Sequence, residues 1–345
     1  MAATIRDLAK KCGLSVSAVS KALNGYSDIS ADTRAAVMRA AEEMDYHPNA
    51  HARALKTGRS YNLGVLFSDD SQSGLTHPFF SAVLEYFKKE AENAGYDVTF
   101  ISHGMGRGRV TYLDHCRYRK VDGVCVACIH FDEDEVLRLI DSDLPLVTID
   151  HAYDGRVCVC SQNREGIRAL LQYVHGLGHR RIAYVHGPGS AVTDARMAAF
   201  LETAGELGLH LPPEYIRPSE YTNPGLAHDA ALALLSLPVP PTCILVCDDY
   251  SAAGVLRAAR ELGLLVPEDL SVAGFDGIDA MQVAYPPLTT VRQDAAAIGR
   301  EAARALIALI ETPEAVTPQT LRIPCHLLTG STVGKVKDGT IQKRI

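Results

Sequence analysis

The chain has 345 residues, of which 47% are hydrophobic and 22% charged, a balance that excludes a largely disordered protein and predicts two or three domains. Its formal net charge is −7, but residues 1–60 hold nine Lys and Arg against six Asp and Glu. A basic N-terminal module on an acidic body indicates that any contact with nucleic acid is confined to that module.

Helical periodicity without strand-like runs sets the first sixty residues apart. Thr4 is expected to cap a first helix, which ends at Gly13. Ser15 is expected to cap a second helix over 16–23, and a third is expected over 30–46. Three short helices with a tight glycine turn between the first two predict a helix-turn-helix unit.

The second helix of this unit is the candidate for reading DNA, because a helix fits the major groove and its first residues approach the base edges. Val16 can meet a thymine methyl group, Ser17 can hydrogen-bond to bases or phosphate, and Lys21 can donate to guanine. The alternative is that these three residues only face solvent.

A short basic segment over 48–56 follows the unit, and a helix of two turns there is too short to be stable alone in water. Leu55 is an apolar residue without a local core, which suits a wedge inserted into the minor groove. Two such helices from a dimer would order against each other on DNA. The alternative is a flexible linker that carries one isolated leucine.

From Tyr61 onward, apolar runs alternate with amphipathic helical segments, which predicts parallel sheets covered on both faces. Buried strands are expected over residues 63–67, 98–101, 123–128, 146–149, 182–185, 243–247, 270–275 and 290–293. Helices between them are expected to include residues 80–94, 166–177, 252–262 and 295–310. In such open sheets, ligands bind beyond the carboxyl ends of the strands.

The N-terminus lacks a signal-peptide pattern and no run is long enough to cross a bilayer, so we expect a cytoplasmic protein without membrane contact. The nine cysteines are expected to be thiols in that reducing compartment. Cys125 and Cys128 have redox-motif spacing but lie in a strand-like run, so we interpret them as buried core residues. No metal, cofactor or catalytic motif is predicted.

Several strings of the sequence resemble the family of the lactose and galactose repressors (LacI/GalR) over about 330 residues. In the N-terminal part these are Thr4-Ile5-Arg6-Asp7-Leu8-Ala9, the run from Ser15 to Asn24, Ile29-Ser30-Ala31-Asp32-Thr33-Arg34 and Tyr46-His47-Pro48-Asn49. Further on they are Gly178-His179-Arg180-Arg181-Ile182, Arg196 with Phe200, Val266-Pro267 with Asp269-Leu270-Ser271, Gly274-Phe275-Asp276 and Leu288 to Gln293.

The resemblance implies an α/β fold in which an N-terminal all-α helix-turn-helix domain precedes a periplasmic-binding-protein-like core of two doubly wound parallel-sheet subdomains. It implies a homodimer on near-palindromic operator DNA, with Leu55 as the intercalating hinge residue. The DNA-contacting residues implied are Thr4, Ser15, Val16, Ser17, Ser20, Lys21, Asn24, Tyr46, Asn49, Arg53, Leu55 and Lys56.

The implied domains are a helix-turn-helix domain over 1–48 and a hinge helix with linker over 49–60. The first subdomain of the core combines 61–161 with 292–320, the second combines 162–291 with 321–334, and a tail covers 335–345. This tail lacks the leucine heptads that make some relatives tetramers, which favours a dimer.

Three positions depart from the family pattern. Ala18 replaces a usual threonine, so one DNA contact is expected to be missing. Lys21 stands where arginine or histidine is frequent, which alters the expected operator sequence. Thr329 occupies a place where arginine is common.

The resemblance places a small-molecule effector between the two subdomains. A sugar pocket needs aromatic faces for the ring and bidentate polar groups for the hydroxyls. The effector-binding residues expected are Phe79, Asp150, His151, Arg196, Tyr221, Asp249 and Asp276. Each has a structural alternative: Asp249 and Asp276 can cap helices, Phe79 and Tyr221 can be core residues, and Arg196 can pair with a carboxylate.

The sequence therefore predicts a DNA-binding transcription regulator, a repressor whose operator affinity is controlled by a small molecule, a sugar or glycoside. Three alternatives stay open: a purine- or nucleoside-responsive regulator of the same family, a sugar-binding protein that does not bind DNA, and an enzyme. The helix-turn-helix segment speaks against the second, and only the α/β body supports the third.

Overall fold

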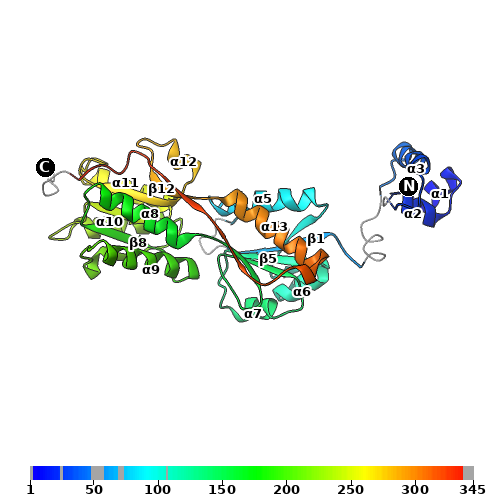
Figure 1. Ribbon diagram of the computed structural model, residues 1–345, viewed down its shortest axis with the longest axis horizontal. Helices are drawn as coiled ribbons and strands as arrows, with labels where there is room; N and C mark the ends of the chain where they lie inside the picture. The colour runs from blue at the N-terminus through cyan, green and yellow to red at the C-terminus, as the bar shows by residue number, and fades with distance from the viewer. Residues whose placement is uncertain (1–2, 24–25, 48–57, 69–73, 106–107, 337–345) are drawn as a thin grey trace. The chain divides into compact units, whose positions relative to one another are not determined.

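The computed structural model describes residues 3–23, 26–47, 58–68, 74–105 and 108–336 (Figure 1). The chain divides into two compact units, Met1–Tyr61 and Asn62–Ile345. Within the described residues, no helix has the length and apolar character needed to span a membrane.

The described α-helices are α1 Ile5–Cys12, α2 Val16–Leu23, α3 Ala31–Glu43, α5 Phe80–Asn93, α6 Tyr112–Arg119, α7 Asp134–Ile140, α8 Asn163–Gly176, α9 Ala191–Glu206, α10 Pro224–Leu235, α11 Asp249–Glu261, α12 Asp279–Gln282 and α13 Ala295–Glu311. Short 3₁₀ turns are η1 Gly74–Thr76, η2 Pro213–Tyr215 and η3 Pro313–Ala315. The strands are β1 Asn62–Phe67, β2 Asp97–Ile101, β3 Gly104–Met105, β4 Gly108–Arg109, β5 Gly123–Ala127, β6 Leu146–Ile149, β7 Val157–Ser161, β8 Ile182–His186, β9 Ile216–Pro218, β10 Cys243–Val246, β11 Ser271–Asp276, β12 Thr289–Gln293, β13 Thr320–Ile323 and β14 Cys325–Leu328.

The N-terminal unit is a three-helix bundle with its own small core. The first helix begins with the expected capping box, in which Thr4 accepts from the Asp7 backbone, and ends at Gly13 with a left-handed φ of 64°. The third helix ends at Glu43, three residues before the expected end, and Tyr46 packs back against the core. The buried residues of this core are Leu8, Ala9, Val19, Ala22, Val37, Ala40 and Ala41.

The second unit contains two six-stranded sheets. The first sheet has the order β13-β7-β6-β5-β1-β2, and all of its neighbouring strands are parallel. The second has the order β14-β12-β11-β10-β8-β9 and is parallel except for the antiparallel edge strand β14. The predicted combination of a helical N-terminal unit with two parallel-sheet lobes is confirmed.

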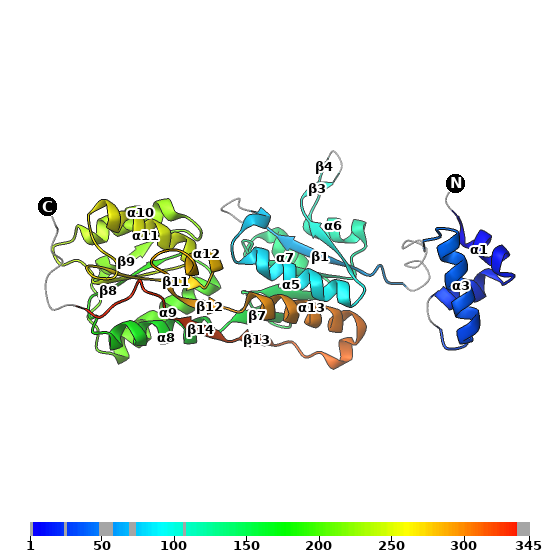
Figure 2. The ribbon, with the colours of Figure 1, turned by 90° about the horizontal axis from the view of Figure 1, so that it is seen from above.

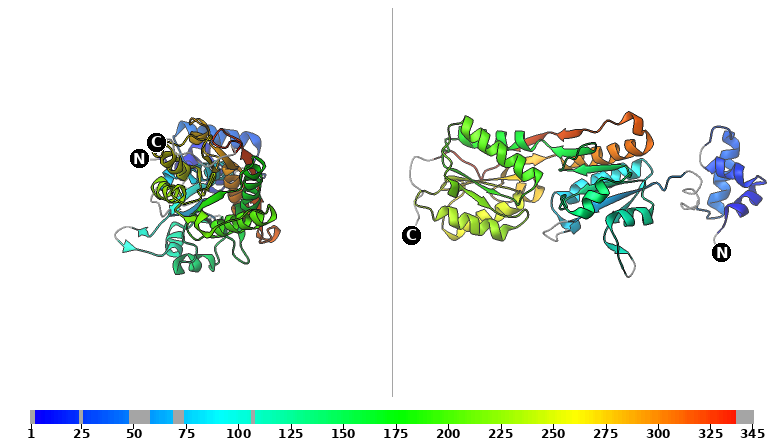
Figure 3. Two further views of the ribbon diagram at one scale, coloured as in Figure 1. Left: turned by 90° about the vertical axis from the view of Figure 1, so that its left-hand side faces the viewer. Right: turned by 90° about the horizontal axis from the view of Figure 1, so that it is seen from below.

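Helices cover both faces of each sheet. Figure 2 shows α10 and α11 on one side of the second sheet and α8 and α9 on the other, and the right-hand view of Figure 3 shows the same layers. In the first lobe, α6 and α7 cover one face while α5 and α13 pair over the other (Figure 1). Gly299 permits this pairing, because a Cβ there would lie 2.3 Å from the Val83 carbonyl oxygen of α5.

The chain passes between the two sheets three times, after β7, after β12 and between β13 and β14. Two of these crossings are tied together, because the Gln162 backbone N–H donates to the Ile323 carbonyl at 2.8 Å. Strand pairing places residues 292 and 293 in the second sheet and residues 321–323 in the first. The sheets thus exchange these few residues relative to the expected segments, because β12 and β13 each keep their strand pairing up to the point where the chain crosses.

Candidate DNA-binding and effector sites

The second helix of the N-terminal unit presents the expected face to solvent. Val16 is 42% exposed and Ser17 is exposed, while Val19 and Ala22 are buried on the opposite side. Ser20 and Lys21 are partly exposed beside them. This pattern follows from the helical period, which puts positions 19 and 22 against the other two helices.

Three of the expected DNA-contacting residues have structural roles in the unit. Thr4 donates its hydroxyl to the Asp7 carboxylate at 2.7 Å, and Ser15 accepts from the Ala18 backbone at 3.1 Å. Tyr46 packs against the core, where burial raises its pKa. Such roles fix the reading helix in place, and contact of these residues with DNA stays a prediction.

Lys21 is held by an ion pair that the sequence pattern did not reveal. Its ammonium group contacts the carboxylate of Asp28, which lies in the segment leading to α3. Hydrogen bonding to Asp28 raises the pKa of Lys21, so the side chain stays charged. The pair is exposed and therefore weak, and a phosphate or base edge can replace the carboxylate.

We expect Asp28→Asn to strengthen DNA binding about two- to fivefold, because it releases Lys21 and removes a negative charge near the DNA. The measurement is fluorescence anisotropy with a labelled operator duplex at fixed salt. Glu43→Gln is the matched control, because it releases Lys11 of α1 from its ion pair with Glu43 of α3. Equal gains in the two variants would show that Lys21 has no particular role.

The remaining predicted DNA contacts lie outside the described residues. These are Asn24, at the end of the second helix, and the four hinge residues Asn49, Arg53, Leu55 and Lys56. The hinge helix therefore stays a prediction from the sequence.

Arg196 on α9 is the centre of the candidate effector site. Its side chain is only 2% exposed, and its guanidinium carbon lies 3.6 Å from the centre of the Phe275 ring. Nε donates to the Asn163 side chain at 2.8 Å, and one terminal nitrogen donates to the Cys247 carbonyl at 2.9 Å. These bonds fix the plane of the guanidinium, as bidentate recognition requires.

Two carboxylates from different sheets interact electrostatically with this guanidinium. Asp150 follows β6 of the first lobe with φ 67°, and its Oδ1 is buried without a hydrogen-bond partner. Asp276 ends β11 of the second lobe and accepts from Gln293 at 2.7 Å. Burial raises the pKa of Asp150 to about 6 and that of Asp276 well above its usual value, and Arg196 opposes both shifts.

Asp249 was expected to bind the effector, but both of its carboxylate oxygens accept hydrogen bonds from the chain itself. It is fully buried, and its two oxygens accept from the Thr290 hydroxyl and the Ile278 backbone N–H. The cap of α11 is its neighbour Asp248, which accepts from the Ser251 backbone at 2.7 Å. The structure thus brings Asp249 to the carboxyl end of the strands, where it anchors the loop after β11.

We expect the melting temperature of the core to fall as the pH rises from 5 to 8. Burial raises the pKa of Asp249 to about 7 in the folded chain, against 3.8 for an unperturbed Asp, so the folded state binds a proton that the unfolded state releases. That stabilisation, up to about 4 kcal/mol, is complete below pH 4 and is lost as the pH passes 7.

Differential scanning fluorimetry across this range measures the pH effect. Asp249→Asn should reduce the slope, because the amide does not titrate and still accepts one hydrogen bond, whereas Asp150 and Asp276, whose pKa values burial also raises, keep part of it. Asp143→Asn, at an exposed position of the loop after α7, is the control and should keep the wild-type slope. An unchanged slope in Asp249→Asn would contradict the assignment.

The aromatic residues expected around the ligand have different surroundings from one another. Tyr221 hydrogen-bonds to Thr193 at 2.8 Å and packs against the second-lobe core, where burial raises its pKa to about 12. Phe79 is 6% exposed and meets the Phe80 ring edge-on. His151 stacks on Phe131 with centroids 4.6 Å apart. Arg196 interacts electrostatically with Tyr221, whereas Phe79 and His151 contact other aromatic rings.

Sequence reasoning missed two buried amides of the site, Asn163, which accepts from Arg196, and Gln293, which donates to Asp276. Asn163 opens α8 and is 6% exposed, and Gln293 ends β12 and is 7% exposed. Their position at the end of a buried strand, Gln293 as the last residue of β12 and Asn163 two residues after β7, was the available signal. Their partners come from segments far away in the sequence, which no local pattern reports.

Two surface cavities lie away from these residues. One cavity of about 550 Å³ runs along α5 and β2 of the first lobe. The other, of about 530 Å³, lies at the amino ends of β8 and β10 in the second sheet, whereas Asp249 and Asp276 lie at the carboxyl ends of the strands. Neither is lined by a residue expected to bind the effector. Buried charges held around Arg196, and not the cavities, therefore define the candidate effector site.

A helix-turn-helix unit joined to a two-lobed α/β core with such a polar site is the architecture of a ligand-responsive transcription regulator. Residues 4–49 match the family model described as bacterial regulatory proteins, lacI family. Residues 171–333 match that of the periplasmic binding protein-like domain. The chain belongs to the LacI family of DNA-binding transcription regulators.

Curated relatives support this assignment over nearly the whole chain. The HTH-type transcriptional repressor CytR of Escherichia coli K12 is 31% identical over 307 residues, which cover 87% of this chain and 88% of CytR. The HTH-type transcriptional repressor PurR of Pasteurella multocida is 29% identical over 314 residues, which cover 90% and 91%. These relatives are transcriptional repressors.

Solved structures agree. The complex of the transcriptional regulator CelR with cellobiose is 26% identical with a TM-score of 0.69, and the match covers 96% of this chain and 99% of that one. A Lac repressor bound to ONPG in the repressed state is 25% identical with a TM-score of 0.79, with coverage of 96% and 100%. A Lac repressor dimer bound to operator and the anti-inducer ONPF is 24% identical with a TM-score of 0.82, covers 97% and 100%, and shares the fold.

Proposed function

We propose that this regulator is a homodimeric repressor whose affinity for a near-palindromic operator is set by a small molecule bound at Arg196. The observation that carries this proposal is a buried guanidinium, fixed by Asn163 and Cys247, that interacts electrostatically with Asp150 of one lobe and Asp276 of the other. A ligand that bridges these groups favours one arrangement of the lobes and shifts the population of DNA-binding states.

The chemistry of the site favours a polyhydroxylated effector, a sugar or glycoside. The guanidinium donates to hydroxyl oxygens, and the two carboxylates accept from hydroxyl hydrogens. The CelR complex, whose ligand is cellobiose, supports this class. A nucleoside is the second candidate, because it also carries a sugar ring and its base can stack on an aromatic face such as the Phe131 and His151 pair.

A thermal-shift panel separates these effector classes. Cellobiose, glucose, galactose, cytidine, adenosine and hypoxanthine are tested separately, because a ligand that binds only the folded chain raises its melting temperature. A shift with a sugar that Arg196→Lys removes supports the proposal. Shifts confined to nucleosides or bases would assign the effector to the nucleoside class instead of the sugars.

The DNA arm of the proposal rests on the N-terminal unit and on Leu55, which lies outside the described residues. Selection from a random duplex pool yields the operator, which should be palindromic and bound with steep salt dependence. Leu55→Ala should weaken operator binding at least tenfold and reduce the ligand response, while Leu75→Ala at an exposed position should change neither. Wild-type affinity in Leu55→Ala would remove the hinge mechanism.

We also propose that the protein acts in the cytoplasm, binds its ligand without converting it, and is divided into 1–48, 49–60, 61–161 with 292–320, 162–291 with 321–334, and 335–345. The strand pairing favours one exchange in this division, of residues 292–293 to the second lobe and of residues 321–323 to the first. The relation to transcriptional repressors supports binding without catalysis. Limited proteolysis tests the division, since cleavage near residue 60 should release a core that still binds the ligand.

A further inference from the structure

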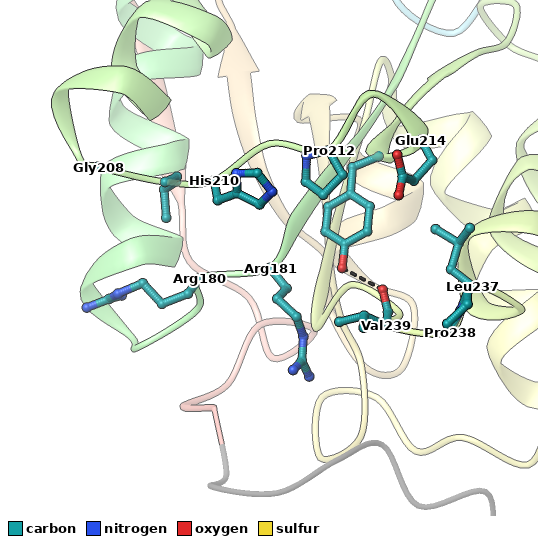
Figure 4. A pocket seen from close by; sticks show the side chains of 11 residues that line it. Arg180, Arg181, Gly208, His210, Pro212, Glu214, Leu237, Pro238 and Val239 are labelled. Atoms are coloured by element: carbon teal, nitrogen blue, oxygen red, sulfur yellow. Dashed lines mark hydrogen bonds between the residues drawn. The ribbon is translucent and has the colours of Figure 1, made fainter.

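The second lobe carries a cavity that no part of the proposed function uses. Its volume is about 530 Å³, and three loops line it: the segment before β8 with Arg180 and Arg181, the segment from α9 to η2, and the segment from α10 to β10. Figure 4 shows the side chain of Arg181 between Arg180 on one side and Leu237 on the other. We call it the basal cavity.

The basal cavity lies at the edge of the second sheet opposite to the effector site. Arg181 immediately precedes β8, and Leu237 and Val239 precede β10, so the cavity is at the amino ends of these parallel strands. Asp249 and Asp276 lie at the carboxyl ends of β10 and β11. Strands of four or five residues separate the two edges by roughly 15 Å.

The cavity holds positive charge that the described chain does not neutralise. Within the described residues, neither Arg180 nor Arg181 forms an ion pair, and the Nε of Arg181 is buried without a hydrogen-bond partner. Among the described residues, Arg180 donates to the carbonyls of His175 and His179. Burial lowers the pKa of both of these histidines, and the nearby charge of Arg180 lowers it further.

The rest of the lining is largely apolar and already ordered. Tyr215 is 2% exposed, and its hydroxyl donates to the Val239 carbonyl at 2.7 Å, which joins two of the three loops. Val239 is 57% exposed, although valine is usually buried, and Leu237 lies beside it. A cavity of this size with a charged group on a largely apolar wall is typical of small-molecule sites.

We propose that the basal cavity is a second ligand site, which takes a small organic anion with its acid group on Arg181 and its apolar body against Tyr215, Leu237 and Val239. Arginine suits planar acid groups because its fork donates two parallel hydrogen bonds. An anion there supplies acceptors to the Arg181 guanidinium, whose Nε has no partner, and Arg180 adds positive charge at the rim. The exposed Glu214 at the rim opposes binding by its negative charge.

Fluorescence anisotropy of 2-naphthoate tests this site, and the chain's lack of tryptophan keeps the background low. We expect saturable binding to the full-length protein, about tenfold weaker or more in Arg181→Gln and measurably tighter in Glu214→Gln. Arg138→Gln on α7 removes the same charge at an exposed position and should leave the affinity unchanged. Arg196→Lys should also leave it unchanged, which separates this site from the effector site.

Two further ligands separate the contribution of the acid group to binding from that of the apolar ring system. The neutral 2-naphthamide and inorganic phosphate should each bind at least about tenfold more weakly than 2-naphthoate. Equal binding of the amide, equal binding of phosphate, no binding of 2-naphthoate at millimolar concentration, or full affinity in Arg181→Gln would overturn the proposal. Because Glu214 is exposed and unpaired within the described chain, its variant reports on the site even if Arg181→Gln melts early.

Discussion

Arg196→Ala is expected to abolish the ligand response, with affinity for the effector found in the thermal-shift panel reduced at least about a hundredfold. The guanidinium supplies two or more charge-assisted hydrogen bonds, each of which contributes about 1.5 to 3 kcal/mol. The same change leaves the buried Asn163 side-chain oxygen and the Cys247 carbonyl without their donor, so the core should lose about 2 to 6 kcal/mol of stability. Titration calorimetry and thermal unfolding measure these two effects.

Two variants separate recognition from stability at this position. Arg196→Lys keeps the charge but not the planar fork, so it should restore much of the stability without restoring the affinity. Arg168→Ala, which removes an exposed pair with Glu206 on the surface of α8 and α9, should affect neither quantity strongly. A ligand bound normally by Arg196→Ala would place the effector elsewhere.

Val19→Asp is expected to eliminate operator binding while the core remains folded. Val19 has no exposed surface and packs in a core of seven buried residues, so an isolated carboxylate there costs several kcal/mol. A unit of about sixty residues has little stability in reserve. We expect at least a hundredfold loss of affinity for the operator, measured by anisotropy.

The core should melt at its wild-type temperature in Val19→Asp and still bind the effector, because Asn62–Ile345 forms a separate compact unit. Met38→Asp introduces the same charge at a position of α3 that is 52% exposed, and it should leave the helical unit folded. Loss of effector binding in Val19→Asp would mean that the two units do not fold independently.

The sequence predicted those parts of the fold that rest on local patterns. All eight expected strands are present, because most of them are short runs rich in apolar and β-branched residues, and Thr4 and Gly13 fix the ends of α1 through neighbours within a few residues. The strands β9, β13 and β14 were missed, since they are only partly buried, and so was the short pair of β3 and β4. The strand β7 was missed as well, although its run Val157–Ser161 is largely buried. Cys128 falls just after β5 with φ 49°, one residue beyond the strand that the sequence suggested.

The candidate site was predictable in position but not in detail. Polar residues that follow buried strands were correctly expected at one edge of the sheets, which brought Asp150, Asp249 and Asp276 to attention. Whether each carboxylate is free or engaged depends on tertiary partners: Thr290 and the Ile278 backbone occupy Asp249, and Asp28 engages Lys21. None of these three partners can be inferred from residues close in the sequence.

The threefold passage of the chain between the sheets has a consequence for biosynthesis. The first sheet acquires its edge strand β13 and its covering helix α13 only from residues 295–323, and Ile298, Ala302 and Leu306 of that helix are fully buried. On the ribosome, the N-terminal helical unit can fold as soon as it emerges, whereas the first lobe must wait for almost the entire polypeptide. Each nascent regulator thus acquires the module that reads DNA well before the lobe that completes its sensor.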